Sequence, residues 1–164
     1  MSQRDDFSSR LDAVESRLAA LAATVAPPTA LTDADPGSGE RWDGGQVWAH
    51  LAEFVPYWID QIRTIVAAGD AEPVGFGRTK NDAGRITAIA RDRTLPVAVL
   101  WSDTRTDIAL LRALLDELSP EAWRARGLHP TLGVMGMERI VDDFLVGHLE
   151  QHADQLEALG RGSA

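Results

Sequence analysis

Two histidines, His148 and His152, stand one helical turn apart within an apolar stripe where a core ordinarily carries aliphatic side chains. A helical projection of residues 134–159 places both rings beside Val141 and Leu156. An imidazole buried there costs free energy unless its nitrogens are paired or coordinated. The i, i+4 spacing points both rings in one direction, which is the geometry that chelates one metal ion. The pair alone leaves two interpretations open, a metal site or two core histidines bonded to neighbouring carboxylates or carbonyls.

A third histidine favours the metal site. His50 lies near the start of a second amphipathic segment, 44–68, at the edge of its apolar face beside Val47 and Phe54. Three of the four histidines therefore lie on or beside faces expected to be buried. Three imidazoles with an open coordination position suit a catalytic rather than a structural ion. Because the chain has no cysteine, any metal must be held by His, Asp or Glu.

The composition limits the class of protein and its partners. The 164 residues are 45% apolar, which indicates a single domain, 1–164, with a proper core and short disordered ends. A net charge of −9 and a pI near 4.8 argue against nucleic acid or an anionic membrane as the main partner. The polar N-terminus has no signal-peptide core, and no stretch approaches the roughly 20 apolar residues of a membrane span. We therefore expect a soluble, cytoplasmic protein.

The periodicity predicts an all-α fold, a four-helix bundle. No convincing strand is found, and the long helical patterns lie at about residues 4–25, 44–68, 95–118 and 134–159. The first pattern carries a seam of apolar residues at steps of four and three: Phe7, Leu11, Val14, Leu18, Leu21 and Val25. Asp43 is expected to cap the second helix, and Pro56 to kink it.

Three polar residues in the second half of the chain are ambiguous. Thr104 and Asp107 fall on or near the inward face of the third helix, either as a helix-bending Thr and a boundary Asp or as pocket lining. His129 lies in a loop rich in Pro and Gly, so we expect it to be a surface or turn residue.

A basic cluster lies in the long connection 70–94, which we expect to be irregular apart from a short helical piece at about 83–90. Five of the sixteen basic residues lie there: Arg78, Lys80, Arg85, Arg91 and Arg93. Such a cluster is either solvated surface or an anion-binding rim beside a pocket. In the second case we expect Arg85 and Arg91 to bind the anionic body of a cofactor.

Three motifs follow one another in a specific order. Trp42-Asp43 precedes the second helix, His50-Leu51 comes early in it, and GHLEQHADQL at 147–156 comes late in the fourth helix. This combination resembles the DinB-like superfamily, which includes the YfiT-like metalloproteins and the mycothiol-dependent maleylpyruvate isomerases. The resemblance covers essentially the whole chain, from the first helix to Leu159.

The resemblance implies an up-down-down-up bundle that binds a divalent metal, zinc or nickel. Carried over by position, the ligands are His50, His148 and His152. Characterised relatives use the metal to activate the thiol of a low-molecular-weight cofactor such as mycothiol or bacillithiol, and then transfer it to an electrophile or isomerise a substrate. Glu53, one turn beyond His50, is expected to orient that ring.

The implied activity is that of a metal-dependent thiol S-transferase or isomerase, with a small-molecule thiol or an electrophile as partner. A metalloprotease is disfavoured because the zincin motif places Glu directly after the first His, where this chain has Leu149. A non-catalytic metal-binding or interaction protein remains the alternative. The apolar seam of the first helix, five tryptophans and the resemblance together predict a homodimer.

Overall fold

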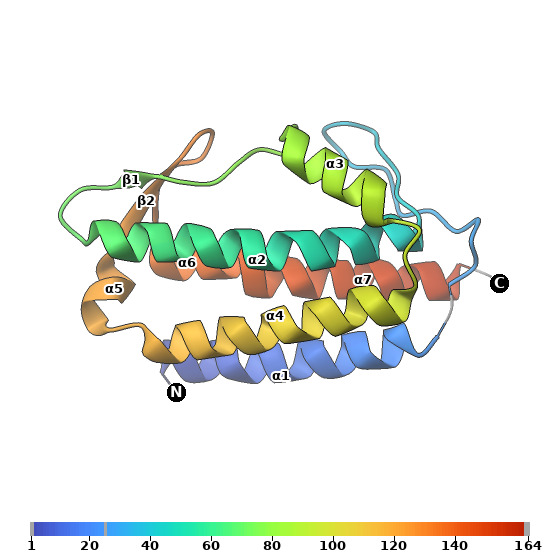
Figure 1. Ribbon diagram of the computed structural model, residues 1–164, viewed down its shortest axis with the longest axis horizontal. Coiled ribbons are helices and arrows are strands. Elements are labelled where there is room, and N and C mark those ends of the chain that lie inside the picture. Colours follow the sequence, from blue (N-terminus) through green and yellow to red (C-terminus); the bar gives the residue numbers. More distant parts are fainter. Residues whose placement is uncertain (1, 25, 163–164) are drawn as a thin grey trace.

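A computed structural model describes residues 2–24 and 26–162, which form a bundle of four long rods with a small sheet at one end (Figure 1). The first three rods are α1 (Gln3–Ala22), α2 (Gly44–Ala68) and α4 (Val97–Glu117). The fourth joins α6 (Met137–Val141), a π-helical turn η1 (Asp142–Val146) and α7 (Gly147–Arg161). The predicted four-helix bundle is confirmed.

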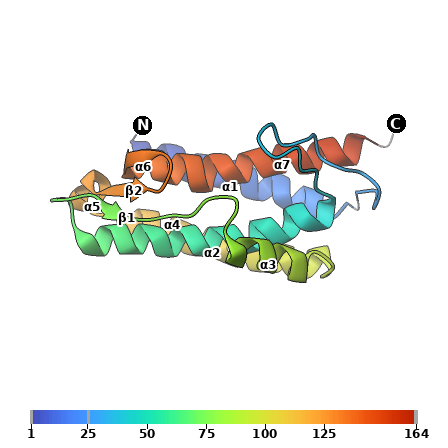
Figure 2. The same ribbon diagram turned by 90° about the horizontal axis from the view of Figure 1, so that it is seen from above.

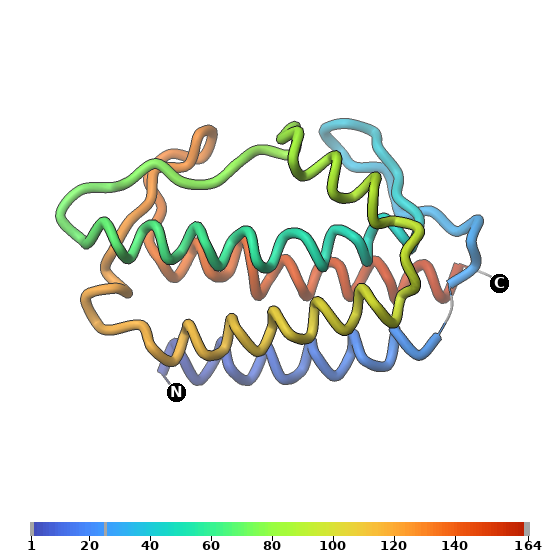
Figure 3. Tube along the Cα trace, in the orientation of Figure 1, coloured from blue at the N-terminus to red at the C-terminus, as the bar shows by residue number. Residues whose placement is uncertain are grey.

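The rods follow the predicted up-down-down-up order (Figure 3). The chain runs one way through α1 and through α6 to α7, and the opposite way through α2 and α4. Because α2 and α4 run in the same direction, a tight turn cannot join them, and residues 69–96 return along the bundle. This return contains a short strand β1 (Val74–Gly75) and the helix α3 (Ala83–Asp92), close to the helical piece expected at 83–90.

The apolar seam of α1 is buried inside the bundle. Phe7, Leu11, Val14 and Leu18 are at most 3% exposed, whereas Val25, its expected end, lies outside the described residues. The predicted cap of α2 is also present. The carboxylate of Asp43 accepts from the backbone N–H of Gln46 at 2.8 Å, and the Gln46 side chain accepts from the N–H of Asp43 at 3.0 Å. This reciprocal cap begins α2 seven residues before His50.

The expectation that the chain has no strand is wrong. Strand β2 (Arg126–His129) pairs antiparallel with β3 (Gly133–Gly136) and parallel with β1, which gives the order β1-β2-β3. Strands of two to four residues are too short to show a period-two pattern. The fourth rod consequently begins at Met137 rather than at residue 134, because residues 133–136 belong to the hairpin.

Helix α2 continues through Pro56 as one rod, so the expected kink does not divide it (Figure 1). Viewed from above, the loop before α2 lies near α7, while α3 lies near the first turns of α2 (Figure 2). Both segments cover the same end of the bundle, which is the end that carries His50. In the described part of the chain, no helix is long and apolar enough to cross a membrane.

Candidate metal centre

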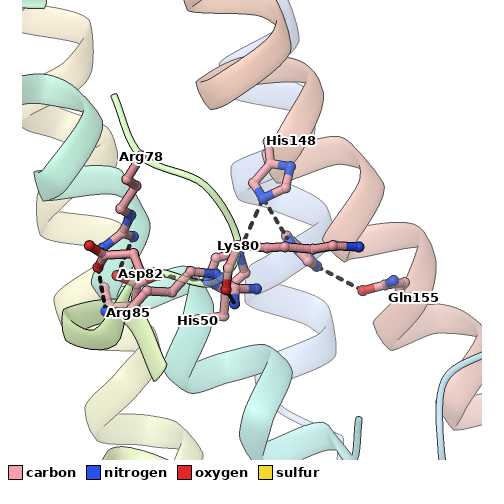
Figure 4. Close-up of polar contacts among 9 residues, drawn as sticks. His50, Arg78, Lys80, Asp82, Arg85, His148 and Gln155 are labelled. Carbon is pink, nitrogen blue, oxygen red and sulfur yellow. Dashed lines mark hydrogen bonds and ion pairs between the residues drawn. The ribbon is translucent and has the colours of Figure 1, made fainter. Parts of the chain in front are cut away.

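Three histidines from two helices converge on one point, and two of them, His50 and His148, are labelled in Figure 4. His50 comes from α2, and His148 and His152 come from α7. The Nε2 atom of His148 lies 3.1 Å from Nε2 of His50 and 3.1 Å from Nε2 of His152. His50 and His152 are buried, and His148 is half-buried. The structure thus brings together all three residues that the sequence named as ligands.

The π turn η1 immediately precedes the first of the two α7 histidines. The residues at 137, 141, 145 and 149 are all buried, at steps of four residues. A step of four exceeds the about 3.6 residues of an α-helical turn. The wider π turn compensates for this excess and keeps the four residues on the buried face. Gly147 closes the turn by donating its N–H to the carbonyl of Asp142. A Cβ at position 147 would lie 2.9 Å from that oxygen, so glycine fits where a larger residue does not.

Two of the rings are oriented by acceptors three residues further along their own helices. The Nδ1 atom of His50 lies 2.7 Å from Oε1 of Glu53, and Nδ1 of His152 lies 2.7 Å from Oε1 of Gln155. Because a carboxylate and an amide oxygen can only accept, each Nδ1 carries the proton and donates it. Each Nε2 therefore presents a lone pair to the centre of the cluster, which is the tautomer that a metal requires.

Burial keeps the three imidazoles neutral at physiological pH. It lowers the pKa of His152 and of His50 well below the ordinary value, and the neighbouring rings lower both further. Burial also lowers the pKa of His148 to about 4. Metal ligands must be unprotonated, so the site is ready to bind a cation near pH 7 without first losing protons.

The donor set fits a divalent transition-metal ion. All three ligand atoms lie within 4.8 Å of one another. Nitrogen ligands about 2.0–2.1 Å from a tetrahedral zinc ion lie about 3.3 Å apart, close to the 3.1 Å separations in the cluster. The Nε2 lone pairs of His50 and His152 face this point, and a cation bound there would accept both. Three imidazoles leave a fourth position of a tetrahedral ion for another ligand.

That fourth position would open toward a cavity of about 560 Å³ lined by all three histidines. Its apolar lining is aromatic: Trp58 and Phe144 stack with ring centroids 4.1 Å apart, and Trp42 lies parallel to the ring of His152 at 6.3 Å. A volume of this size accommodates a small organic molecule beside the ion. Flat aromatic surfaces favour ligands with an apolar or planar portion.

A second layer of contacts supports His50. Glu53 is 9% exposed in its side chain, and its Oε2 atom accepts from Nη2 of Arg78 at 2.5 Å. The Arg78 guanidinium stacks over the Tyr57 ring at 3.8 Å. Burial raises the pKa of Glu53, and the ion pair with Arg78 opposes that shift. The expected orientation of His50 by Glu53 is present, and Arg78 is a supporting residue that the sequence did not reveal.

The five basic residues of the connection 70–94 separate into two groups. Arg78, Lys80 and Arg85 line the cavity. Arg91 pairs with Asp92 with 71% of its side chain exposed, and Arg93 pairs with Asp43. Neither Arg91 nor Arg93 lines the cavity. The structure therefore does not place Arg91 where it was expected to bind the anionic body of a cofactor.

The sequence predicted His129 to be a surface or turn residue, and it is the last residue of β2, beside the hairpin turn, but not at the surface. It is 5% exposed and stacks on Phe144 at 5.2 Å. Its Nε2 lies 3.2 Å from the carbonyl of Arg78, and its Nδ1 accepts the backbone N–H groups of Thr131 and Leu132, each at 3.3 Å. His129 therefore attaches the segment that carries Arg78 to the hairpin, a contact that pairs distant parts of the chain.

The two polar residues of α4 have no role in the cavity. Thr104 is fully buried, and its hydroxyl donates to the carbonyl of Leu100 at 2.8 Å, as a helix-bending core threonine does. Asp107 is half-buried, and burial followed by the charge of Asp103 raises its pKa to about 6. Neither residue lines the cavity beside the histidines.

Comparison with known proteins gives matches of structure only. No protein-family model and no curated protein matches the sequence. YfiT from Bacillus subtilis, described as a probable metal-dependent hydrolase with an unusual four-helix bundle topology, matches with a TM-score of 0.76 at 19% identity over 99% of this chain and 89% of that one. The mycothiol-dependent maleylpyruvate isomerase matches with a TM-score of 0.67 at 16% identity over 95% of this chain. An uncharacterised protein from Clostridium difficile 630 gives 0.68 at 10% identity, covering 100% and 99% of the two chains.

These matches show that the chain has the helical-bundle fold of YfiT and of the mycothiol-dependent maleylpyruvate isomerase, so the fold that the sequence resemblance implied is confirmed. This chain spans about 63% of the length of the isomerase. Fold does not determine reaction, so the chemistry must be argued from the site itself.

Proposed function

We propose that this protein is a metal-dependent enzyme that activates a small thiol, such as mycothiol or bacillithiol, for transfer to an electrophile or for isomerisation of a substrate. The observation that carries the proposal is the triad of neutral imidazoles whose Nε2 atoms converge at the wall of a cavity. A divalent ion held there, zinc or nickel, would lower the pKa of a thiol in its open position and make it nucleophilic.

Some residues around the triad orient its imidazoles, and others line the cavity in which a ligand would bind. Glu53 and Gln155 hold two imidazoles in the tautomer that donates a lone pair to the ion. Trp42, Trp58 and Phe144 line the cavity with aromatic surface, from which a bound ligand would displace water. Water exclusion strengthens every charge interaction near the triad, including those with a thiolate.

Metal analysis and one spectroscopic titration test the proposal. Purified protein should contain about one divalent ion per chain, and His152→Ala should contain almost none. Equal metal content in the two proteins would refute the triad as the binding site. With cobalt in place of the native ion, a thiol that enters the open position should produce a thiolate-to-cobalt absorption band. The absence of a band with every biological thiol would exclude thiol activation and leave a metal-binding protein of unknown function.

A further inference from the structure

The cavity beside the triad carries three cationic side chains, and two of them are already neutralised within the chain. The guanidinium of Arg78 pairs with Glu53 at 2.5 Å and with Asp82 at 3.5 Å. The ammonium of Lys80 pairs with Asp35 at 2.8 Å. Neither is free to recognise a ligand unless an internal ion pair first breaks.

Arg85 differs from both. Across residues 2–24 and 26–162, no carboxylate oxygen lies within the 4.0 Å of an ion pair from its guanidinium nitrogens. Its Nη1 donates to the carbonyl of Lys80 at 2.9 Å, and its Cζ lies 5.1 Å from the centroid of the Trp42 ring. The guanidinium is thus held by two contacts, of which one uses a single N–H donor, and Arg85 lines the cavity.

The position of Arg85 is fixed by the backbone as well. Asp82 caps α3 by accepting from the backbone N–H of Arg85 at 2.8 Å, which places Arg85 in the first turn of that helix (Figure 4). Trp42 lies between Arg85 and the triad, since the same indole that meets the guanidinium is parallel to the ring of His152. A ligand lying along Trp42 would therefore reach the open metal position and Arg85 together.

We propose that Arg85 is the specificity-determining residue of the cavity, and that it selects ligands carrying a carboxylate beside an apolar or planar body. A half-buried guanidinium with no carboxylate at ion-pair distance gains most from a ligand carboxylate, which it can bind through two parallel hydrogen bonds. A neutral isostere leaves those donors unpaired and binds less well. The inference rests on the proposed function only in assigning the carboxylate and the reactive thiol to the same ligand, a condition that bacillithiol meets through its malate group and mycothiol, which has no free carboxylate, does not.

The first test uses cobalt-loaded protein and two thiols that differ in charge, 3-mercaptopropionate and 2-mercaptoethanol. In the wild type, the absorption band should saturate at a concentration about tenfold lower for the carboxylate thiol. Arg85→Gln should abolish this preference and retain the metal, whereas the matched control Arg91→Gln, on the exposed face of the same helix, should keep it. A preference that survives in Arg85→Gln would overturn the inference.

The second test needs no metal, so it separates the inference from the proposed function. In metal-free protein, benzoate should shift the indole N–H resonance of Trp42, assigned with Trp42→Phe, at lower concentration than benzamide does. Arg85→Gln should remove the difference between the two ligands. Equal shifts in the wild type would overturn the role of Arg85. If benzoate is preferred while no thiol gives a cobalt band, thiol activation is refuted and the role of Arg85 stands.

Discussion

The carboxylate of Glu53 joins His50 to Arg78: Oε1 lies 2.7 Å from Nδ1 of the imidazole, and Oε2 accepts from the guanidinium at 2.5 Å. The side chain of Glu53 therefore sets the tautomer of His50 and neutralises the charge of Arg78, which lies 25 residues later in the sequence. Such an acceptor makes the imidazole a better donor to a metal ion. It also makes metal affinity depend on a residue that would not touch the ion.

Replacing Glu53 by Gln should weaken metal binding by about 10–100-fold, because the amide still accepts from His50 but carries no charge. Arg78 would then keep only its longer ion pair, with Asp82 at 3.5 Å. Competition with a zinc chelator measures the affinity. Glu150→Gln is the matched control, since Glu150 pairs with Arg10 and contacts none of the three histidines. Equal affinities for the two variants would contradict this role of Glu53.

His129→Ala should destabilise the fold by about 3 kcal/mol and leave the metal content unchanged. The substitution opens a space beside Phe144 and leaves the carbonyl of Arg78 without its donor. Urea unfolding of metal-free protein measures the free energy, and elemental analysis measures the metal. His152→Ala, in contrast, should lose the metal. Loss of metal in His129→Ala would mean that the hairpin contact shapes the site.

Asp107→Asn should stabilise the protein at pH 8 and not at pH 4. Burial raises the pKa of Asp107 to about 6 from an ordinary value of 3.8, so the folded state holds a proton that the unfolded state releases between these values. The carboxyl therefore destabilises the fold increasingly as the pH rises from about 4 to about 6, and the penalty is complete above that. After allowance for solvent screening the gain is about 1 kcal/mol.

Thermal unfolding of Asp107→Asn and the wild type across pH 4–8 tests this dependence. Asp116→Asn, on an exposed position of the same helix, is the control and should show no such trend. A stability difference for Asp107→Asn that is constant over the whole pH range would rule out titration of this carboxyl as its cause.

The homodimer remains a prediction, although part of its original basis is removed. Four residues of the α1 seam are buried within a single chain and are not available to a partner: Phe7, Leu11, Val14 and Leu18. Val99 and Leu110 on α4 are 45% and 47% exposed, and their spacing of eleven residues, about three turns, places them on one side of the helix. Light scattering at micromolar concentration should give a mass near twice 17.8 kDa, whereas the mass of one chain would exclude the dimer.

Local periodicity was sufficient to predict the four long helices and two of the three candidate ligands. The seam of α1 and the cap at Asp43 depend on neighbours three or four residues away, which a helical projection reproduces. The i, i+4 spacing of His148 and His152 is local in the same sense. The meeting of His50 with that pair, 98 residues later, was indicated by residue type and by resemblance, because no local pattern measures a distance between helices.

Tertiary structure alone decided which polar residues belong to the site. Arg85 and Arg91 lie on the same short helix and look alike in the sequence, yet one lines the cavity and the other pairs with Asp92 at the surface. The burial of His129 and the pairing of Glu53 with Arg78 likewise follow from the return of residues 69–96 along the bundle. A side chain acquires such a role from what packs against it, and those neighbours come from parts of the chain that local sequence does not relate.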